Sequence, residues 1–211
     1  MTTYPAPSPP YVGPPAKHSG QGNKPIRRIV LHGTVSPAVK GGARNIAAYF
    51  RSSSAGGSAH YIVDPGEVVQ SAFDDVIAGH APPNQHSIGV EFCDPVTMDV
   101  RRWDDAAHRA ELKLGARLVA ELCLAYDVPP VMLTPAQLRA GARGICEHDD
   151  VSDAWGQSSH WDLGAFPRRR FASMVRAEVA RIKGNAAEAD REDKVAVSRV
   201  TKARDLLEAA L

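Results

Sequence analysis

Ile29-Val30-Leu31-His32-Gly33-Thr34 is the stretch that sets the fold class of this chain. Three consecutive apolar residues without polar alternation are typical of a strand buried on both faces, as in a parallel sheet covered by helices. His32 follows the apolar run directly. Because sites in α/β sheets gather at the carboxyl ends of the strands, His32 is a candidate site residue by position.

A second stretch, Ile145-Cys146-Glu147-His148, also brings a short apolar run to a histidine. The segment after it predicts a long loop over residues 149–163, with Asp162 fourteen positions beyond His148. Two histidines and a carboxylate suit an open zinc site, which leaves a fourth position for water or substrate. Cys146 would face the same side of a strand as His148, so it remains an alternative metal ligand.

Apolar residues at helical spacing predict two core helices, one over residues 104–126 and one that begins at Pro167 and ends at Gly184. His108 falls in the first turns of the longer helix, where we expect it to be exposed. Thr134, with a proline after it and a glutamine three positions on, predicts the start of a shorter helix.

Asp64-Pro65-Gly66-Glu67 separates two strand-like runs and predicts a hairpin, because proline presets the turn and glycine accepts a positive φ. His60 lies in the first run, and we interpret it as a hydrogen-bonded core residue rather than a ligand. A further buried strand covers residues 87–93. These elements together predict an α/β fold with a mixed central β-sheet flanked by helices.

Glu91 is out of place in the apolar strand over residues 87–93. A carboxylate in such a strand costs free energy unless it is paired, hydrogen-bonded or protonated. Its presence therefore invites a functional interpretation.

Composition divides the 211 residues into three parts. Residues 1–24 hold six of the 16 prolines and predict a disordered tail, residues 25–184 form the predicted catalytic domain, and residues 185–211 alternate charges as expected of a helical tail or linker. The net charge of +1 argues against a nucleic-acid binder, but it allows a local basic face for an anionic polymer. We expect a monomer.

No apolar run approaches the ~20 residues of a transmembrane helix, and the first residues lack the charged and apolar regions of a signal peptide. We therefore expect synthesis in the cytoplasm without a signal peptide. Cys93, Cys123 and Cys146 are odd in number and widely spaced, which predicts buried thiols rather than a disulfide framework.

Four motifs in this order resemble the zinc-dependent N-acetylmuramoyl-L-alanine amidases of the type-2 amidase family, which includes phage endolysins, muropeptide-recycling amidases and peptidoglycan recognition proteins. They are residues 30–34, 87–91, 147–149 and 160–164, and the resemblance covers about residues 26–183. It implies hydrolysis of the amide between N-acetylmuramic acid and L-alanine in peptidoglycan. It also implies Zn²⁺ held by the ligands His32, His148 and Asp162, with Glu91 as the catalytic group that moves protons.

The resemblance implies further roles around the ligands. His160 stands where many relatives carry lysine, so it could stabilise the oxyanion as a catalytic residue; its alternative role is to orient Asp162. His80 could bind substrate in the groove, or it could be a surface histidine. Trp161 could pack against the sugar, or it could wedge the loop.

The chain departs from the family at two further positions without losing a ligand. Ala59 replaces the tyrosine that some relatives carry before the hairpin histidine, so proton transfer must rest on Glu91. Leu163 replaces the proline of the usual Asp-Pro-Gly.

The predicted biological role is that of a phage endolysin, which acts on the cell wall after its release during host lysis. A cytoplasmic muropeptide-recycling amidase is the nearest alternative. A non-catalytic peptidoglycan-binding module is a third, kept open by Ala59. A cleft for an unrelated small molecule, with purely structural histidines, is the fourth.

Overall fold

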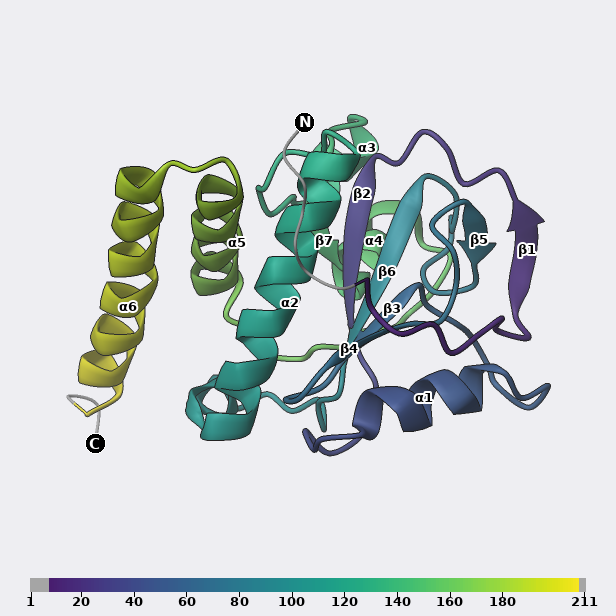
Figure 1. Cartoon of the computed structure of the whole chain (residues 1–211), viewed down its shortest axis with the longest axis horizontal. Coiled ribbons are helices and arrows are strands. Elements are labelled where there is room, and N and C mark those ends of the chain that lie inside the picture. Colours follow the sequence, from purple (N-terminus) through teal and green to yellow (C-terminus); the bar gives the residue numbers. More distant parts are fainter. Residues whose placement is uncertain (1–7, 209–211) are drawn as a thin grey trace.

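The computed structural model describes residues 8–208, and it has a five-stranded sheet in the order β4-β3-β6-β2-β7 (Figure 1). β2 pairs in parallel with both β6 and β7, and β6 pairs in parallel with β3, whereas β3 and β4 form the predicted hairpin and are antiparallel. The sheet is therefore mixed, as predicted. Its strands are β2 (Arg28–Gly33), β3 (Tyr61–Val63), β4 (Val68–Gln70), β6 (Ser87–Phe92) and β7 (Gly144–Glu147).

Helices cover both faces of the sheet, and in Figure 1 α2 lies in front of it and α4 behind it. Alternate residues of β2 enter different clusters: Ile29 and Leu31 join the large core that includes α2 and α5, while Val30 joins a smaller one with α3 and α4. His32 is two positions after Val30, so its side chain lies on the same face of the sheet, the face covered by α4. The helices are α1 (Gly42–Phe50), α2 (Ala106–Ala125), α3 (Pro135–Arg139), α4 (His148–Trp155), α5 (Arg168–Ile182), α6 (Ala186–Glu208) and the 3₁₀-helix η1 (Val100–Asp104).

The expectation that His108 is exposed is wrong. Its side chain is buried, with Nε2 3.1 Å from Asp94 Oδ1 and Nδ1 2.7 Å from Asp105 Oδ2. Asp105 also caps α2 by accepting from the backbone N–H of His108. The buried carboxylate of Asp94, which comes from the end of the sheet, gives the imidazole a polar partner that helical periodicity does not reveal.

The predicted loop over residues 149–163 is wrong in its first half, because α4 begins directly at His148. Glu147 and Asp150 form a capping box at its start, and Gly156 ends the helix with a φ of 65°. Asp149 and Asp150 are favourable in a first helical turn, because they face its unpaired N–H groups. The irregular segment that carries Asp162 is correspondingly short.

Residues 8–24 differ from the predicted disordered tail; the remainder of that segment, residues 1–7, lies outside the described part of the chain. β1 (His18–Gln21) pairs with β5 (Val76–Ala78) in a small antiparallel sheet. Asn23 is fully buried, and its Nδ2 donates to the carbonyl of Ser87 at 2.7 Å. Backbone and amide hydrogen bonds hold this segment on the domain, together with the packing of Val12 on an apolar cluster and the stacking of Tyr11 on Phe73.

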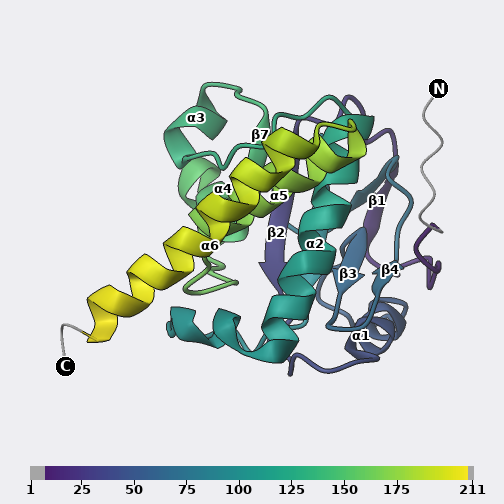
Figure 2. The same ribbon diagram turned by 60° about the vertical axis from the view of Figure 1, so that its left-hand side comes forward.

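α6 packs along α5 at the outside of the domain (Figure 2). An ion pair joins the two helices, with Arg176 Nη2 2.8 Å from Glu192 Oε2. Among the described residues, none of the helices combines the length and apolarity that crossing a membrane requires.

Candidate metal centre

Three side chains from separate parts of the chain converge at the carboxyl edge of the sheet. His32 ends β2, His148 begins α4, and Asp162 lies in the following loop. Asp162 Oδ2 is 2.9 Å from His32 Nδ1, and its Oδ1 is 2.8 Å from His148 Nδ1. One ligand atom from each of the three lies within 4.8 Å of the others. The structure thus brings the three predicted ligands together.

Strand register explains why these side chains meet. Leu31 pairs with Glu147, so His32 and His148 follow side by side at the ends of β2 and β7. On the other side of β2, His32 pairs with Glu91 of β6. Parallel strands in register therefore present three functional groups in one row.

The loop after Asp162 is held by a half-buried arginine, Arg102. Arg102 donates to the carbonyls of Leu163 at 2.6 Å and Ala165 at 2.9 Å. Leu163 is fully buried, and the backbone N–H of Gly33 donates to Asp162 Oδ2 at 3.3 Å. These contacts place the carboxylate against the end of β2.

Charge and burial suit a cation at this position. Burial lowers the pKa of His32, which favours its neutral form. Asp162 Oδ1 is buried, and His148 Nδ1 lies 2.8 Å from it. Two imidazole nitrogens and an ionised carboxylate are a donor set that fits Zn²⁺.

Glu91 stands beside the cluster without joining it. Its side chain is half-buried and has no hydrogen-bond or ion-pair partner within the part of the chain that the structure describes. Burial, followed by the negative charge of Asp162, raises its pKa well above the ordinary value. A carboxyl group with a raised pKa and no fixed partner is suited to accept and return a proton.

His160 and Trp161 lie on the exposed side of the cluster. The His160 ring stacks on His148, with 4.9 Å between centroids and 26° between planes. Trp161 is 59% exposed, which leaves an indole face available for contact. Their roles in catalysis and substrate binding remain predictions.

His80 is buried behind His32, so it does not line an open groove as expected. Its Nδ1 lies 3.0 Å from His32 Nε2, and its Nε2 lies 3.0 Å from Ser87 Oγ. No local sequence pattern indicates this contact, since 48 positions separate the two histidines.

His60 and Cys146 are core residues. The His60 ring accepts from the N–H of Gly89 at 2.9 Å and lies 2.9 Å from the carbonyl of Val76, in agreement with its predicted structural role. Cys146 is a buried free thiol in the apolar cluster with α4, outside the ligand cluster. Burial raises the pKa of this thiol, which disfavours the thiolate that a metal would need.

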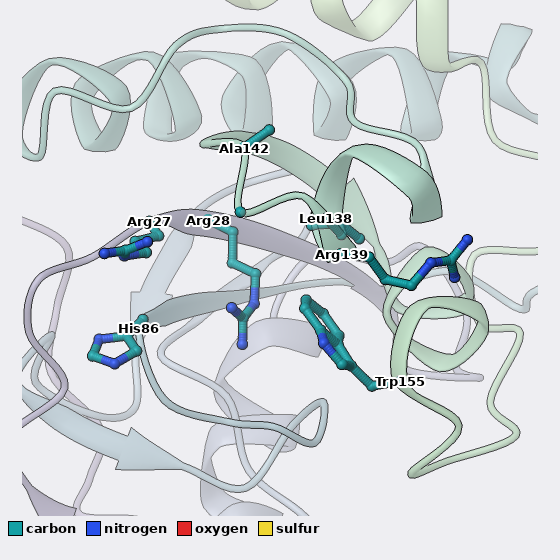
Figure 3. Close-up of a pocket in the computed structure, with 8 residues that line it drawn as sticks. Arg27, Arg28, His86, Leu138, Arg139, Ala142 and Trp155 are labelled. Atoms are coloured by element: carbon teal, nitrogen blue, oxygen red, sulfur yellow. The ribbon is translucent and has the colours of Figure 1, made fainter.

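A cavity of about 400 Å³ lies at the opposite end of β2 (Figure 3). Three arginines, His86 and Trp155 contribute to its lining, and no acidic residue does. The buried Arg28 guanidinium lies 5.0 Å from the Trp155 ring centroid and donates to the carbonyls of Pro83 and Gln85. Arg28 therefore anchors the loop that connects His80 to β6.

Comparisons with known proteins agree with this geometry. The sequence model of the type-2 amidase family, described as N-acetylmuramoyl-L-alanine amidase, matches residues 22–165. A comparison with curated protein sequences gives no match.

Solved structures with a similar fold include hydrolase AmiA of Staphylococcus aureus in complex with its ligand, with 16% identity, a TM-score of 0.66, and coverage of 88% of this chain and 89% of that one. A mutant endolysin from Bacillus subtilis matches with 18% identity, a TM-score of 0.54 and coverage of 81% and 99%. N-acetylmuramoyl-L-alanine amidase LysC from Clostridium intestinale matches with 15% identity, a TM-score of 0.51 and coverage of 80% and 98%. At these identities the likeness establishes the fold.

Proposed function

This chain belongs to the N-acetylmuramoyl-L-alanine amidase family, and we propose that it works with Zn²⁺ held by His32, His148 and Asp162 and serves as an endolysin. As a family member, it is a hydrolase that cleaves the amide between N-acetylmuramic acid and L-alanine in peptidoglycan. The observation that carries the zinc proposal is the convergence of two imidazole Nδ1 atoms on one ionised carboxylate.

Bound Zn²⁺ would supply Lewis acidity, which lowers the pKa of water and polarises the scissile carbonyl. Glu91 accepts the proton of the attacking water and returns it to the departing nitrogen. Its place beside His32 on the neighbouring strand supports this role, as does its lack of a competing partner among residues 8–208. Proton transfer by such a group contributes about 10²–10⁴-fold to the rate.

His160 is proposed to donate an N–H to the oxyanion that forms on the scissile carbonyl. Its ring stacks on His148 and is exposed to solvent, so substrate can reach it. Ala59 is fully buried in the apolar cluster under α1, so this position offers no group to the reaction. Proton transfer therefore rests on Glu91.

The likeness in fold to an endolysin from Bacillus subtilis supports the proposed role as an endolysin. An endolysin must act on intact peptidoglycan, whereas a recycling amidase acts on soluble anhydromuropeptides. Substrate preference therefore separates the two roles.

Mass spectrometry of products released from purified peptidoglycan, with and without a chelator, tests the proposal. We expect free stem peptides that begin with L-alanine, their loss on chelation and their return with zinc. Release that survives complete metal removal would refute the zinc site. Release only from soluble muropeptides would indicate a recycling enzyme, and binding without release would indicate a binding module.

A further inference from the structure

We propose that His80 and Ser87 are positioning residues that fix the tautomer of His32, so that its Nδ1 lone pair points toward Asp162 before any metal binds. The inference rests on the proposed zinc site, but the hydrogen-bond directions that support it belong to the protein alone. They follow from a relay that starts at a backbone carbonyl.

The relay begins at the carbonyl of Asn84, which can only accept a hydrogen bond. Ser87 Oγ lies 2.6 Å from it, so the single hydroxyl proton of Ser87 points to Asn84. The Ser87 oxygen must then accept from its other close neighbour. That neighbour is His80 Nε2 at 3.0 Å, so His80 carries its proton on Nε2.

The protonation of His80 in turn determines the direction of the hydrogen bond between His80 and His32. His80 is buried, and its two ring nitrogens face the Ser87 hydroxyl and the His32 ring rather than a carboxylate, which favours a neutral ring. A neutral imidazole with Nε2–H accepts at Nδ1. His32 Nε2, 3.0 Å away, must therefore be the donor, which leaves His32 Nδ1 as a lone pair.

The result is an electron-rich site. The His32 Nδ1 lone pair lies 2.9 Å from Asp162 Oδ2, itself an acceptor. Two acceptors at this distance are unfavourable unless a cation lies beside them. The relay thus prepares Nδ1, rather than Nε2, as the metal-binding nitrogen.

A second chain of hydrogen bonds places the proton of His148 on Nε2 as well. Ser152 Oγ donates to the carbonyl of His160 at 3.1 Å, so Ser158 must donate to Ser152 Oγ at 2.7 Å. Ser158 Oγ then accepts from His148 Nε2 at 3.1 Å. The Nδ1 lone pair of His148 faces Asp162 in turn, so two independent relays from two carbonyls converge.

The surroundings hold His80 in this orientation. Asn84 Oδ1 accepts from the backbone N–H groups of His80 at 3.0 Å and Ala81 at 2.8 Å. The ring lies against Gly89, where an added Cβ would come within 2.8 Å of His80 Cγ. Arg28 fixes the carbonyls on either side of Asn84.

Long-range ¹H–¹⁵N NMR of the metal-free protein, labelled with ¹⁵N-histidine, tests the inference directly. We expect His32 and His148 as Nε2–H tautomers. A neutral His32 with its proton on Nδ1 would overturn the proposal. This measurement needs neither zinc nor activity, so it is decisive even if the protein fails to bind zinc, an outcome that would refute the proposed function instead.

Variants test the consequence for the metal. We expect His80→Leu to weaken zinc binding about 10–100-fold, the usual effect of losing a partner of a metal-bound histidine. His80→Asn keeps an acceptor near the position of Nδ1 and should restore most of the affinity and the His32 tautomer. His108→Gln changes another buried, hydrogen-bonded histidine outside the relay and serves as the matched control. Folded His80→Leu with wild-type zinc affinity in chelator competition would contradict the proposal.

Discussion

His32 and Glu91 are paired positions on neighbouring parallel strands, β2 and β6, at the same edge of the sheet. Residues in register on adjacent strands project to the same face, so a proposed metal ligand and a proposed proton-transfer group lie side by side. The spacing between them is set by the backbone ladder. This arrangement lets each function be removed separately.

Glu91→Gln should separate catalysis from metal binding. The amide keeps the shape of the side chain but cannot accept the water proton, so we expect kcat to fall about 10²–10⁴-fold. Zinc affinity, measured by chelator competition, should stay near that of the wild type, because Glu91 lies outside the ligand cluster. Wild-type kcat in this variant would remove Glu91 from the mechanism.

His148→Ala should remove metal and activity together. Two ligands remain, and we expect zinc affinity to fall by more than the ~100-fold that loss of an outer partner costs. Zinc content after dialysis and release of stem peptides report the two effects. Unchanged hydrolysis would show that the mechanism is wrong.

Metal removal should destabilise the protein without a change in sequence. A ligand that binds only the folded state stabilises it by about 4 kcal/mol at 1,000 times its Kd. We therefore expect chelator to lower the thermal midpoint and added zinc to restore it, while His148→Ala responds to neither. An equal response in that variant would place the zinc elsewhere.

His160 substitutions should distinguish an oxyanion donor from a loop support. Loss of one oxyanion donor costs about 10²–10³ in kcat, so His160→Ala should fall in that range, and His160→Lys, which keeps an N–H donor, should recover part of it. The two variants should bind zinc equally. If both lose zinc affinity while kcat of the zinc-saturated enzymes is normal, His160 orients Asp162 instead.

Glu111 should make stability depend on pH. It is fully buried in α2, and neither carboxyl oxygen has a hydrogen-bond partner in the described part of the chain; burial, aided by Asp94 and Asp64, raises its pKa to about 9. The unfolded chain ionises near the ordinary value of 4.5, so the neutral group favours folding below that pH and this stability is lost as pH rises toward 9.

Glu111→Gln keeps the neutral shape and removes this dependence. We measure the free energy of unfolding of both proteins by urea denaturation. As the pH rises from about 5 to about 8, we expect the value for the variant to increase relative to the wild type by on the order of a few kcal/mol. Parallel pH profiles for the two proteins would show that Glu111 does not titrate as inferred.

The sequence by itself determined the strand that carries His32, the strand that leads to His148, the hairpin around Asp64, and the core helix over residues 104–126. These follow from apolar periodicity and turn chemistry, which act between near neighbours in the chain. The order of four motifs identified the family and predicted the ligand set. The location of the site at one edge of the sheet could also be inferred from the sequence, because the carboxyl ends of parallel strands lie at the same edge.

Only the tertiary structure decided how polar side chains are paired. The direction of His80 toward His32, the burial of His108 on Asp94, and the anchoring of Asn23 beneath Ser87 each depend on a partner brought from elsewhere in the chain. A hydrogen bond needs its two atoms within about 3 Å at a suitable angle, and no local pattern encodes that distance. The sequence predicted the ligands, and the packing of distant segments determined which nitrogen of each histidine faces Asp162.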